Sequence, residues 1–194
     1  RSSAASDVYK RQLVDGVLIV YAGDTLYRID PVSGEILTQA KMDHASSFSI
    51  TPPAYAKGMV FVGLSDGTIQ AFNAKTLQSL WIYHDPLEGQ PNSPITICGD
   101  YLYTGFWRSE EFPANFVCLS ITDEDPTRTD EEKTACWYWT NPGGYYWAGA
   151  YACEDYVLVG TDDGADESTS MTGSLLLLDA KTGRLLDKWD SLYG

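Results

Sequence analysis

Residues 57–81 read KGMVFVGLSDGTIQAFNAKTLQSLW, and the phrase returns as EDYVLVG at 154–160 followed by GSLLLLDAKTGRLL at 173–186. Weaker copies begin at Asp15-Gly16 and at Gly99-Asp100. The phrase therefore occurs four times in one chain, at a spacing of roughly 40 residues except where the third copy carries inserts. A recurrence of this length indicates a repeat architecture, in which each copy is one structural unit that packs on its neighbours.

Each copy contains the same sequence of strand signals. A β-branched or aromatic run comes first, and a second run such as 68–72 alternates apolar and polar residues after a glycine-containing turn. An Asp/Asn-x-x-Thr/Ser-Gly turn follows, as in 179–183, and leads into a third run. With a fourth strand before each copy, the pattern predicts an all-β fold, a β-propeller of four-stranded antiparallel blades. We expect the blades near residues 13–43, 44–85, 90–140 and 145–190.

The pattern resembles the quinoprotein-like (PQQ-like) propeller repeat, whose consensus is roughly Gly-x-Val-Tyr-x-Gly, Asp-Gly-x-Leu-x-Ala-Leu-Asp-Ala-x-Thr-Gly and then Trp. The resemblance covers about residues 14–189, and matching positions include Gly67, Asn73, Trp81 and Asp179. This repeat family usually forms seven or eight blades, so the resemblance implies a partial propeller with about four of them present.

The chain departs from the family's enzymes at two kinds of position. Those enzymes carry a Trp eight residues after the turn Asp, which helps to lock neighbouring blades. By this count only Trp81 fits, and the other countable positions hold Thr38 and Asp187, with Trp189 displaced by two. The enzymes also carry a vicinal Cys-Cys pair against the quinone, whereas no two cysteines are adjacent here.

The first residues do not fit the repeat. Residues 2–12 resemble a translated sequencing adaptor, so we expect 1–12 to be a non-native scar and 13–194 to be the partial propeller. A partial propeller leaves open blade faces, and the expected partners of those faces are missing blades of the same chain.

The charge of the chain excludes several classes of partner. The formal net charge of −14 disfavours nucleic acid, because duplex affinity depends on cationic contacts with phosphate. It equally disfavours anionic membrane surfaces, and no apolar run reaches the length of a membrane-spanning helix.

The four cysteines fall into two pairs. If the strands around 115–121 and 134–139 form a hairpin, Cys118 and Cys136 lie roughly opposite each other, and a disulfide is geometrically feasible. Cys98 and Cys153 occupy the same repeat position in successive copies, so a second bridge is feasible there. Paired cysteines favour an extracytoplasmic location (periplasmic, secreted or cell-surface), and four reduced, buried thiols are the alternative.

Propeller topology places the longest and most aromatic loops on one face, where function commonly resides. We expect a ligand-binding surface there because Trp, Tyr and Arg are favoured interface anchors, or, alternatively, aromatics that only cover the seams between blades. Its residues are Trp107, Arg108, Tyr145, Tyr146 and Trp147. The same face carries Asp162, Asp163 and Asp166, whose oxygens could hold calcium, although a plain solvated loop is the simpler reading. We expect the insert 123–133, on the opposite face, to be a solvent-exposed loop.

Two functions follow from these features. The first is a non-catalytic PQQ-like propeller module that binds a protein or small ligand through one loop face, in a secreted or cell-surface bacterial protein, with no cofactor expected. The second is a fragment of a pyrroloquinoline-quinone-dependent dehydrogenase, which would hold the quinone and calcium on the propeller axis. No residue of this chain can be carried over to that catalytic site, so the first function is preferred.

Overall fold

The repeated phrases fold as β-sheets in the computed structural model, which describes residues 11–46, 51–109, 111–145, 149–163 and 172–193. The first sheet contains β1 (Arg11–Val14), β2 (Val17–Ala22), β3 (Thr25–Ile29) and β4 (Ile36–Lys41). The second contains β5 (Ala54–Ala56), β6 (Met59–Leu64), β7 (Thr68–Asn73) and β8 (Ser79–His84), joined by β12 (Glu131–Lys133). The third contains β9 (Thr96–Cys98), β10 (Tyr101–Gly105), β11 (Ala114–Ser120) and β13 (Trp137–Asn141). The fourth contains β14 (Tyr151–Ala152), β15 (Tyr156–Gly160), β16 (Thr172–Asp179) and β17 (Leu185–Tyr193).

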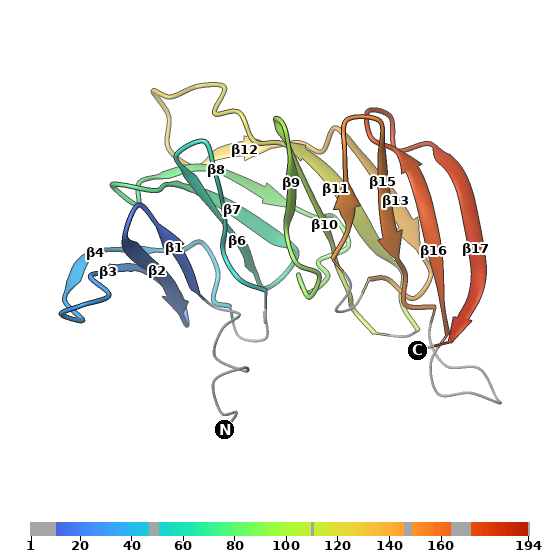
Figure 1. Ribbon diagram of the computed structural model, residues 1–194, viewed down its shortest axis with the longest axis horizontal. Coiled ribbons are helices and arrows are strands. Elements are labelled where there is room, and N and C mark those ends of the chain that lie inside the picture. Colours follow the sequence, from blue (N-terminus) through green and yellow to red (C-terminus); the bar gives the residue numbers. More distant parts are fainter. Residues whose placement is uncertain (1–10, 47–50, 110, 146–148, 164–171, 194) are drawn as a thin grey trace.

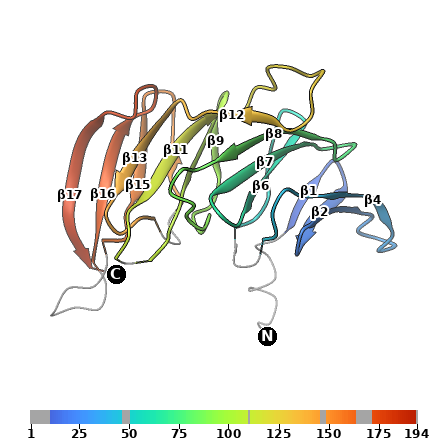
Figure 2. The same ribbon diagram turned by 180° about the vertical axis from the view of Figure 1, so that it is seen from behind.

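The four sheets are the blades of a propeller, which confirms the predicted fold class. They stand side by side in chain order, with the first blade at one end of the molecule and the fourth at the other (Figures 1 and 2). The first strands of adjacent blades contact one another, β1 with β5, β5 with β9 and β9 with β14, so these strands line the inner side of the arc. Strand β1 begins at Arg11, inside the segment expected to be a scar. Among the described residues, no helix could cross a membrane.

Three of the four blades turn from their third to their fourth strand through the same side-chain geometry. Asp30, Asn73 and Asp179 each accept hydrogen bonds from the backbone N–H groups two and three residues further on, at 2.7–3.1 Å. The side chain thereby replaces part of the backbone pairing that a tight turn loses. These donors hold the pKa values of the Asp30 and Asp179 carboxyls below 3.8, with the Thr182 hydroxyl the largest cause at Asp179.

The lowered pKa values predict that the turns at Asp30 and Asp179 lose stability in acid, whereas the corresponding turn of the second blade does not. A carboxyl whose pKa is lowered on folding stabilises the protein above its unfolded pKa, and this stabilisation is lost as pH falls through the lower folded value. Asn73 makes the same bonds without titrating. The double variant Asp30→Asn/Asp179→Asn should therefore lose less stability than the wild type between about pH 5 and about pH 3, as measured by urea unfolding. Equal losses in the two proteins would contradict this role.

The core consists of three seams, one between each pair of neighbouring blades. The first seam joins residues such as Ile19 and Leu26 to Val60 and Phe72, all at 0% exposure. The second joins blade 2 to blade 3, and the third joins blade 3 to blade 4. Alternate residues of each central strand face opposite seams, which is why β6, β7 and β11 are buried along nearly their whole length.

Two tryptophans lock successive seams from the same register position. Trp81 pairs with Ala71 across β7 and β8, and its indole N–H donates to the Ile121 carbonyl of the next blade at 3.4 Å. Trp137 pairs with Cys118 across β11 and β13, and its indole N–H donates to the Ala180 carbonyl at 3.0 Å. The prediction that only Trp81 fills this role was therefore incomplete.

The first seam is held differently. Thr38 occupies the position of Trp81 and Trp137, opposite Arg28. The Arg28 guanidinium instead reaches across the seam and donates to the Lys75 carbonyl at 2.5 Å. In the fourth blade the position holds Asp187, opposite Leu177.

The insert of the third copy is solvent-exposed over most of its length, as predicted, but its end is not. Its end forms β12, which pairs in parallel with β8 of the preceding blade. Lys133 is 6% exposed, and its ammonium lies 5.5 Å from the centre of the Trp81 ring and donates to the Thr122 carbonyl. The insert therefore clamps the seam between blades 2 and 3 and covers Trp81 with a cation.

Candidate functional site

The loops on one face of the propeller are tied together by backbone hydrogen bonds. Gln90, in the loop after β8, exchanges two N–H···O=C bonds of 2.6 and 2.9 Å with Trp107, in the loop after β10. The Tyr145 N–H donates to the Phe106 carbonyl, and the Asp162 N–H donates to the Gly144 carbonyl, each at 2.9 Å. These hydrogen bonds connect the loops of successive blades and give this face a fixed shape.

A buried carboxylate anchors this face at the seam between blades 2 and 3. Asp85 is 1% exposed and accepts hydrogen bonds from the Asn115 amide at 2.9 Å, the Tyr83 hydroxyl at 3.1 Å and the Leu87 N–H at 3.1 Å. Burial raises the pKa of Asp85 above its ordinary value, and these donors, together with the nearby Arg108 guanidinium, act in the opposite direction. With its donors in place, Asp85 fixes the loop that holds Gln90 to the third blade.

Arg108 and Phe112 form the exposed tip of the pinned loop. Arg108 is exposed, and its guanidinium carbon lies 5.3 Å from the centre of the Phe112 ring, which is 52% exposed. The Phe112 N–H donates to the Ser109 carbonyl at 3.3 Å, so the two side chains are held on a narrow hairpin. Trp107 is half-buried at its base. An Arg stacked on an exposed aromatic ring is a combination that interfaces favour.

Tyr145 does not belong to this surface, unlike Trp107 and Arg108. Its side chain is fully buried, its ring lies 5.4 Å from that of Phe116, and its hydroxyl donates to the Trp139 carbonyl at 3.2 Å. Burial raises its pKa well above the ordinary value. Tyr145 therefore packs in the seam between blades 3 and 4, whereas Tyr146 and Trp147 lie outside the described residues.

The carboxylate of Asp163, in the described part of the acidic loop, already has protein partners. The Asp163 carboxylate accepts from Asn141 at 3.0 Å, from Thr161 at 2.8 Å and from Ser174 at 2.6 Å. Asp162 is 8% exposed, and Asp166 lies outside the described residues. Within the described ranges, no group of three or more His, Cys, Asp or Glu side chains is placed to hold a metal ion.

The structure brings the two histidines of the chain together on the same face. The His44 and His84 rings are 6.0 Å apart, and Asp43 lies between them, 2.6 Å from the His44 Nδ1 and 3.9 Å from the His84 Nε2. The sequence separates them into different copies, but the loop after β4 and the end of β8 reach the same edge of the propeller. This topological argument could have paired them before the structure was known.

All four cysteines are free thiols and lie in the third and fourth blades. The Cys136 N–H donates to the Cys118 carbonyl at 2.8 Å, but the register pairs Cys118 with Trp137 rather than with Cys136. Burial raises the pKa of the Cys118 thiol well above its usual range, and the neighbouring Cys136 thiol adds to the increase. Cys98 and Cys153 line one cavity of about 260 Å³ between the two blades.

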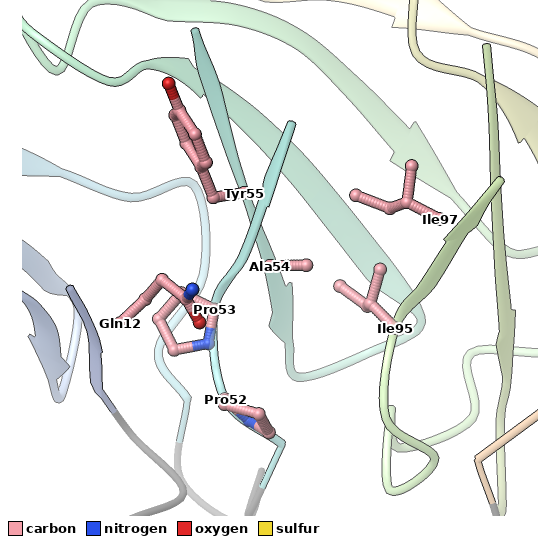
Figure 3. A pocket seen from close by; sticks show the side chains of 7 residues that line it. All are labelled: Gln12, Pro52, Pro53, Ala54, Tyr55, Ile95 and Ile97. Carbon is pink, nitrogen blue, oxygen red and sulfur yellow. The ribbon is translucent and has the colours of Figure 1, made fainter. Parts of the chain in front are cut away.

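A shallow cavity of about 250 Å³ opens on the inner side of the arc, where β1, β5 and β9 converge (Figure 3). Its lining residues are Gln12, Pro52, Pro53, Ala54, Tyr55, Ile95 and Ile97. None of them is cationic, and no pair of adjacent cysteines exists to contact a quinone. The residues present here do not fit the anionic cofactor pyrroloquinoline quinone.

The fold and its pinned loop face define a β-propeller of the PQQ-like repeat class. Residues 6–111, more than half of the chain, match the family model described as outer membrane protein assembly factor BamB. The chain therefore belongs to this family, and the resemblance inferred from the repeats is confirmed. No curated protein sequence gives a match.

Solved structures with low sequence identity share the fold. The quinohemoprotein alcohol dehydrogenase of Comamonas testosteroni superposes with a TM-score of 0.70 at 16% identity, covering 93% of this chain and 34% of that one. The enzyme ADHIIG from Pseudomonas putida HK5 gives 0.68 at 14%, covering 93% and 33%. BamB from Moraxella catarrhalis gives 0.61 at 14%, covering 93% and 48%. The chain thus spans about a third of each dehydrogenase and about half of that BamB.

Proposed function

We propose that this chain is a non-catalytic propeller module that binds a protein through its loop face, in a secreted or cell-surface bacterial protein. The observation that carries the proposal is the pair of Arg108 and Phe112, exposed at the tip of a loop whose base is fixed by the Gln90–Trp107 bonds. A rigid loop loses little conformational entropy on binding, which favours affinity. A protein partner fits better than a small ligand because these two side chains are exposed at the surface, whereas small ligands favour enclosed cavities.

Photo-crosslinking in the cells that make the protein tests this role. A photoreactive residue at position 112 should give a discrete adduct with a partner, and Arg108→Ala should reduce that adduct several-fold. The matched control is position 32, because Val32 is 95% exposed in a turn on the opposite face. Adducts of the same pattern from both positions, or none from position 112, would contradict the proposal.

A fragment of a quinone-dependent dehydrogenase is the alternative function. The superposition on two quinohemoprotein alcohol dehydrogenases supports it through the fold alone. The inner cavity lacks cationic groups and the chain lacks adjacent cysteines, so its own residues favour the binding module. Titration of the chain with the quinone and calcium should leave the quinone absorbance unchanged, and saturable binding would favour the enzyme.

We further propose that Cys118 and Cys136 form a disulfide in an oxidising compartment. Their thiols are neighbours, and the strand that contains Cys118 is joined to Cys136 by a backbone hydrogen bond. After oxidation, the number of thiols that react with a labelling reagent should fall by two. The bridge should raise the free energy of unfolding by about 3 kcal/mol relative to Cys136→Ser. Cys98→Ser serves as the control, with no change expected in the 118–136 bridge. Full thiol labelling after oxidation would contradict this proposal.

A further inference from the structure

An open cavity of about 440 Å³ lies among the turns of the face opposite the Arg108–Phe112 tip. It is lined by the turn between β5 and β6, the turn between β7 and β8, and the start of the insert that leads into β12. Its volume is within the range of small-ligand sites and exceeds the roughly 250 and 260 Å³ of the two cavities described above. The cavity therefore has room for a small molecule.

One carboxylate oxygen at this cavity lacks a hydrogen-bond donor. Asp123 lines the cavity, and its Oδ1 is buried without a hydrogen-bond partner among the described residues. A buried acceptor without a donor is costly, and native proteins seldom leave one in that state. A donor from outside the chain would remove this cost.

The residues on both sides of Asp123 are held by one buried cation. The Lys133 ammonium donates to the Thr122 carbonyl at 2.5 Å and to the Glu124 carboxylate at 3.1 Å. Lys133 belongs to β12, which pairs with β8 of the second blade. The segment that carries Asp123 is therefore fixed beside blade 2, while the Asp123 Oδ1 stays without a donor.

A cation that lines the same cavity is also held in place. The Asn73 side chain accepts a hydrogen bond from the Lys75 N–H at 2.9 Å, and Arg28 of the first blade donates to the Lys75 carbonyl. The Lys75 ammonium has no ion-pair partner within the described ranges, whereas the second lysine of the cavity, Lys57, is paired with Asp100. Lys75 is thus the cation that is available to a ligand.

The rest of the lining favours a ligand that has no net charge and an apolar part. Two anions and two cations line the cavity, namely Asp15, Asp123, Lys57 and Lys75. Met59 and Leu80, both half-buried, add an apolar wall. A zwitterion with an apolar group matches this combination of charges and apolar surface.

We propose that this cavity binds a small α-amino acid with an apolar side chain, whose ammonium group donates to Asp123 and whose carboxylate pairs with Lys75. The side chain of the ligand then lies against Met59 and Leu80. Such a ligand supplies the donor that the Asp123 Oδ1 lacks and the anion that the Lys75 ammonium lacks. A ligand with a single charge satisfies only one of the two groups.

Calorimetric titration of the whole chain with L-leucine tests the proposal. We expect saturable binding with a dissociation constant below about 1 mM. Two analogues separate the charges, because N-acetyl-L-leucine lacks the ammonium group and 3-methylbutylamine lacks the carboxylate. Each analogue should bind roughly tenfold more weakly than L-leucine, since one charged contact is lost.

Two variants assign the contacts to single residues. Asp123→Asn keeps the size of the side chain and removes its charge, so it should weaken L-leucine roughly tenfold and leave N-acetyl-L-leucine unchanged. Lys75→Met should weaken L-leucine by a similar factor and leave 3-methylbutylamine unchanged. The control is Asp130→Asn, which changes an exposed carboxylate of the same insert outside the cavity and should alter none of the three affinities.

The contrary results are equally specific. A wild-type chain that shows no saturable binding of L-leucine up to about 10 mM would overturn the proposal. Equal affinities of Asp123→Asn and Asp130→Asn for L-leucine would also overturn it. Circular dichroism should show that all three variants are folded. A variant that weakens both analogues alike would contradict the assigned contacts, because each analogue retains only one of the two charges.

Discussion

Replacing Trp81 with Ala should destabilise the protein by about 4 kcal/mol, because a fully buried indole leaves a large cavity when it is removed. The indole packs on Phe61 at 5.7 Å between ring centres, donates to the Ile121 carbonyl and lies under the Lys133 ammonium. Its removal therefore also leaves a buried carbonyl without that donor and a buried cation without its aromatic partner. Urea unfolding followed by far-ultraviolet circular dichroism measures the change without relying on tryptophan fluorescence.

Trp137→Ala should cost a similar amount, because Trp137 makes the equivalent contact with the Ala180 carbonyl. Tyr138→Ala is the matched control on the neighbouring position of β13, where the side chain is 60% exposed, and it should change stability by less than about 1 kcal/mol. Thr38→Ala, at the equivalent position of the first blade, should also have a small effect. A Trp81 or Trp137 variant no less stable than the Tyr138 variant would disprove the locking role.

Replacing Gly105 with Ala should destabilise the protein by about 3 kcal/mol through overpacking. A Cβ atom at position 105 would lie 2.5 Å from the Tyr145 Cβ and 2.8 Å from its Cγ. Tyr145 cannot move aside, since it is fully buried against Phe116. The repeat uses the same device in blade 2, where a Cβ on Gly63 would lie 2.8 Å from the Cβ of Pro91.

Gly149→Ala is the control for this prediction. A Cβ there would meet its nearest neighbour, the Pro94 Cβ, at an ordinary 3.6 Å, so a change below about 0.5 kcal/mol is expected. Thermal unfolding of the two variants measures the contrast. Equal midpoints for Gly105→Ala and Gly149→Ala would show that the Tyr145 ring is not held as described.

The repeat made the blades predictable, but not every contact between them. Alternation and turn residues identify each blade because they depend on nearby residues only. The lock at Trp137 escaped the sequence because the insert after Ser120 lengthens the interval that the eight-residue count measures. Register, in contrast, is a property of the paired strands, and it places Trp137 opposite Cys118 as Trp81 lies opposite Ala71.

The position of the candidate surface was predictable from the sequence, but only some of the residues assigned to it lie there. Topology put the aromatic loops on one face, and the exposed Arg108 lies there. Tyr145 was assigned to the surface because composition cannot distinguish an aromatic that covers a seam from one that faces a partner. Phe112 was not among the predicted residues, since only the structure shows its ring 5.3 Å from the Arg108 guanidinium carbon. The β12 clamp was missed because its charged sequence resembles a solvated loop.

Amide hydrogen exchange on the intact chain tests most directly the central claim, that this propeller presents an exposed tip on a rigid loop. The account predicts strong protection of the Gln90 and Trp107 amides, which exchange hydrogen bonds across the loops, and rapid exchange at Arg108. Exchange of the Gln90 and Trp107 amides as fast as that of Arg108 would contradict it, because the loop would then not be fixed before a partner binds.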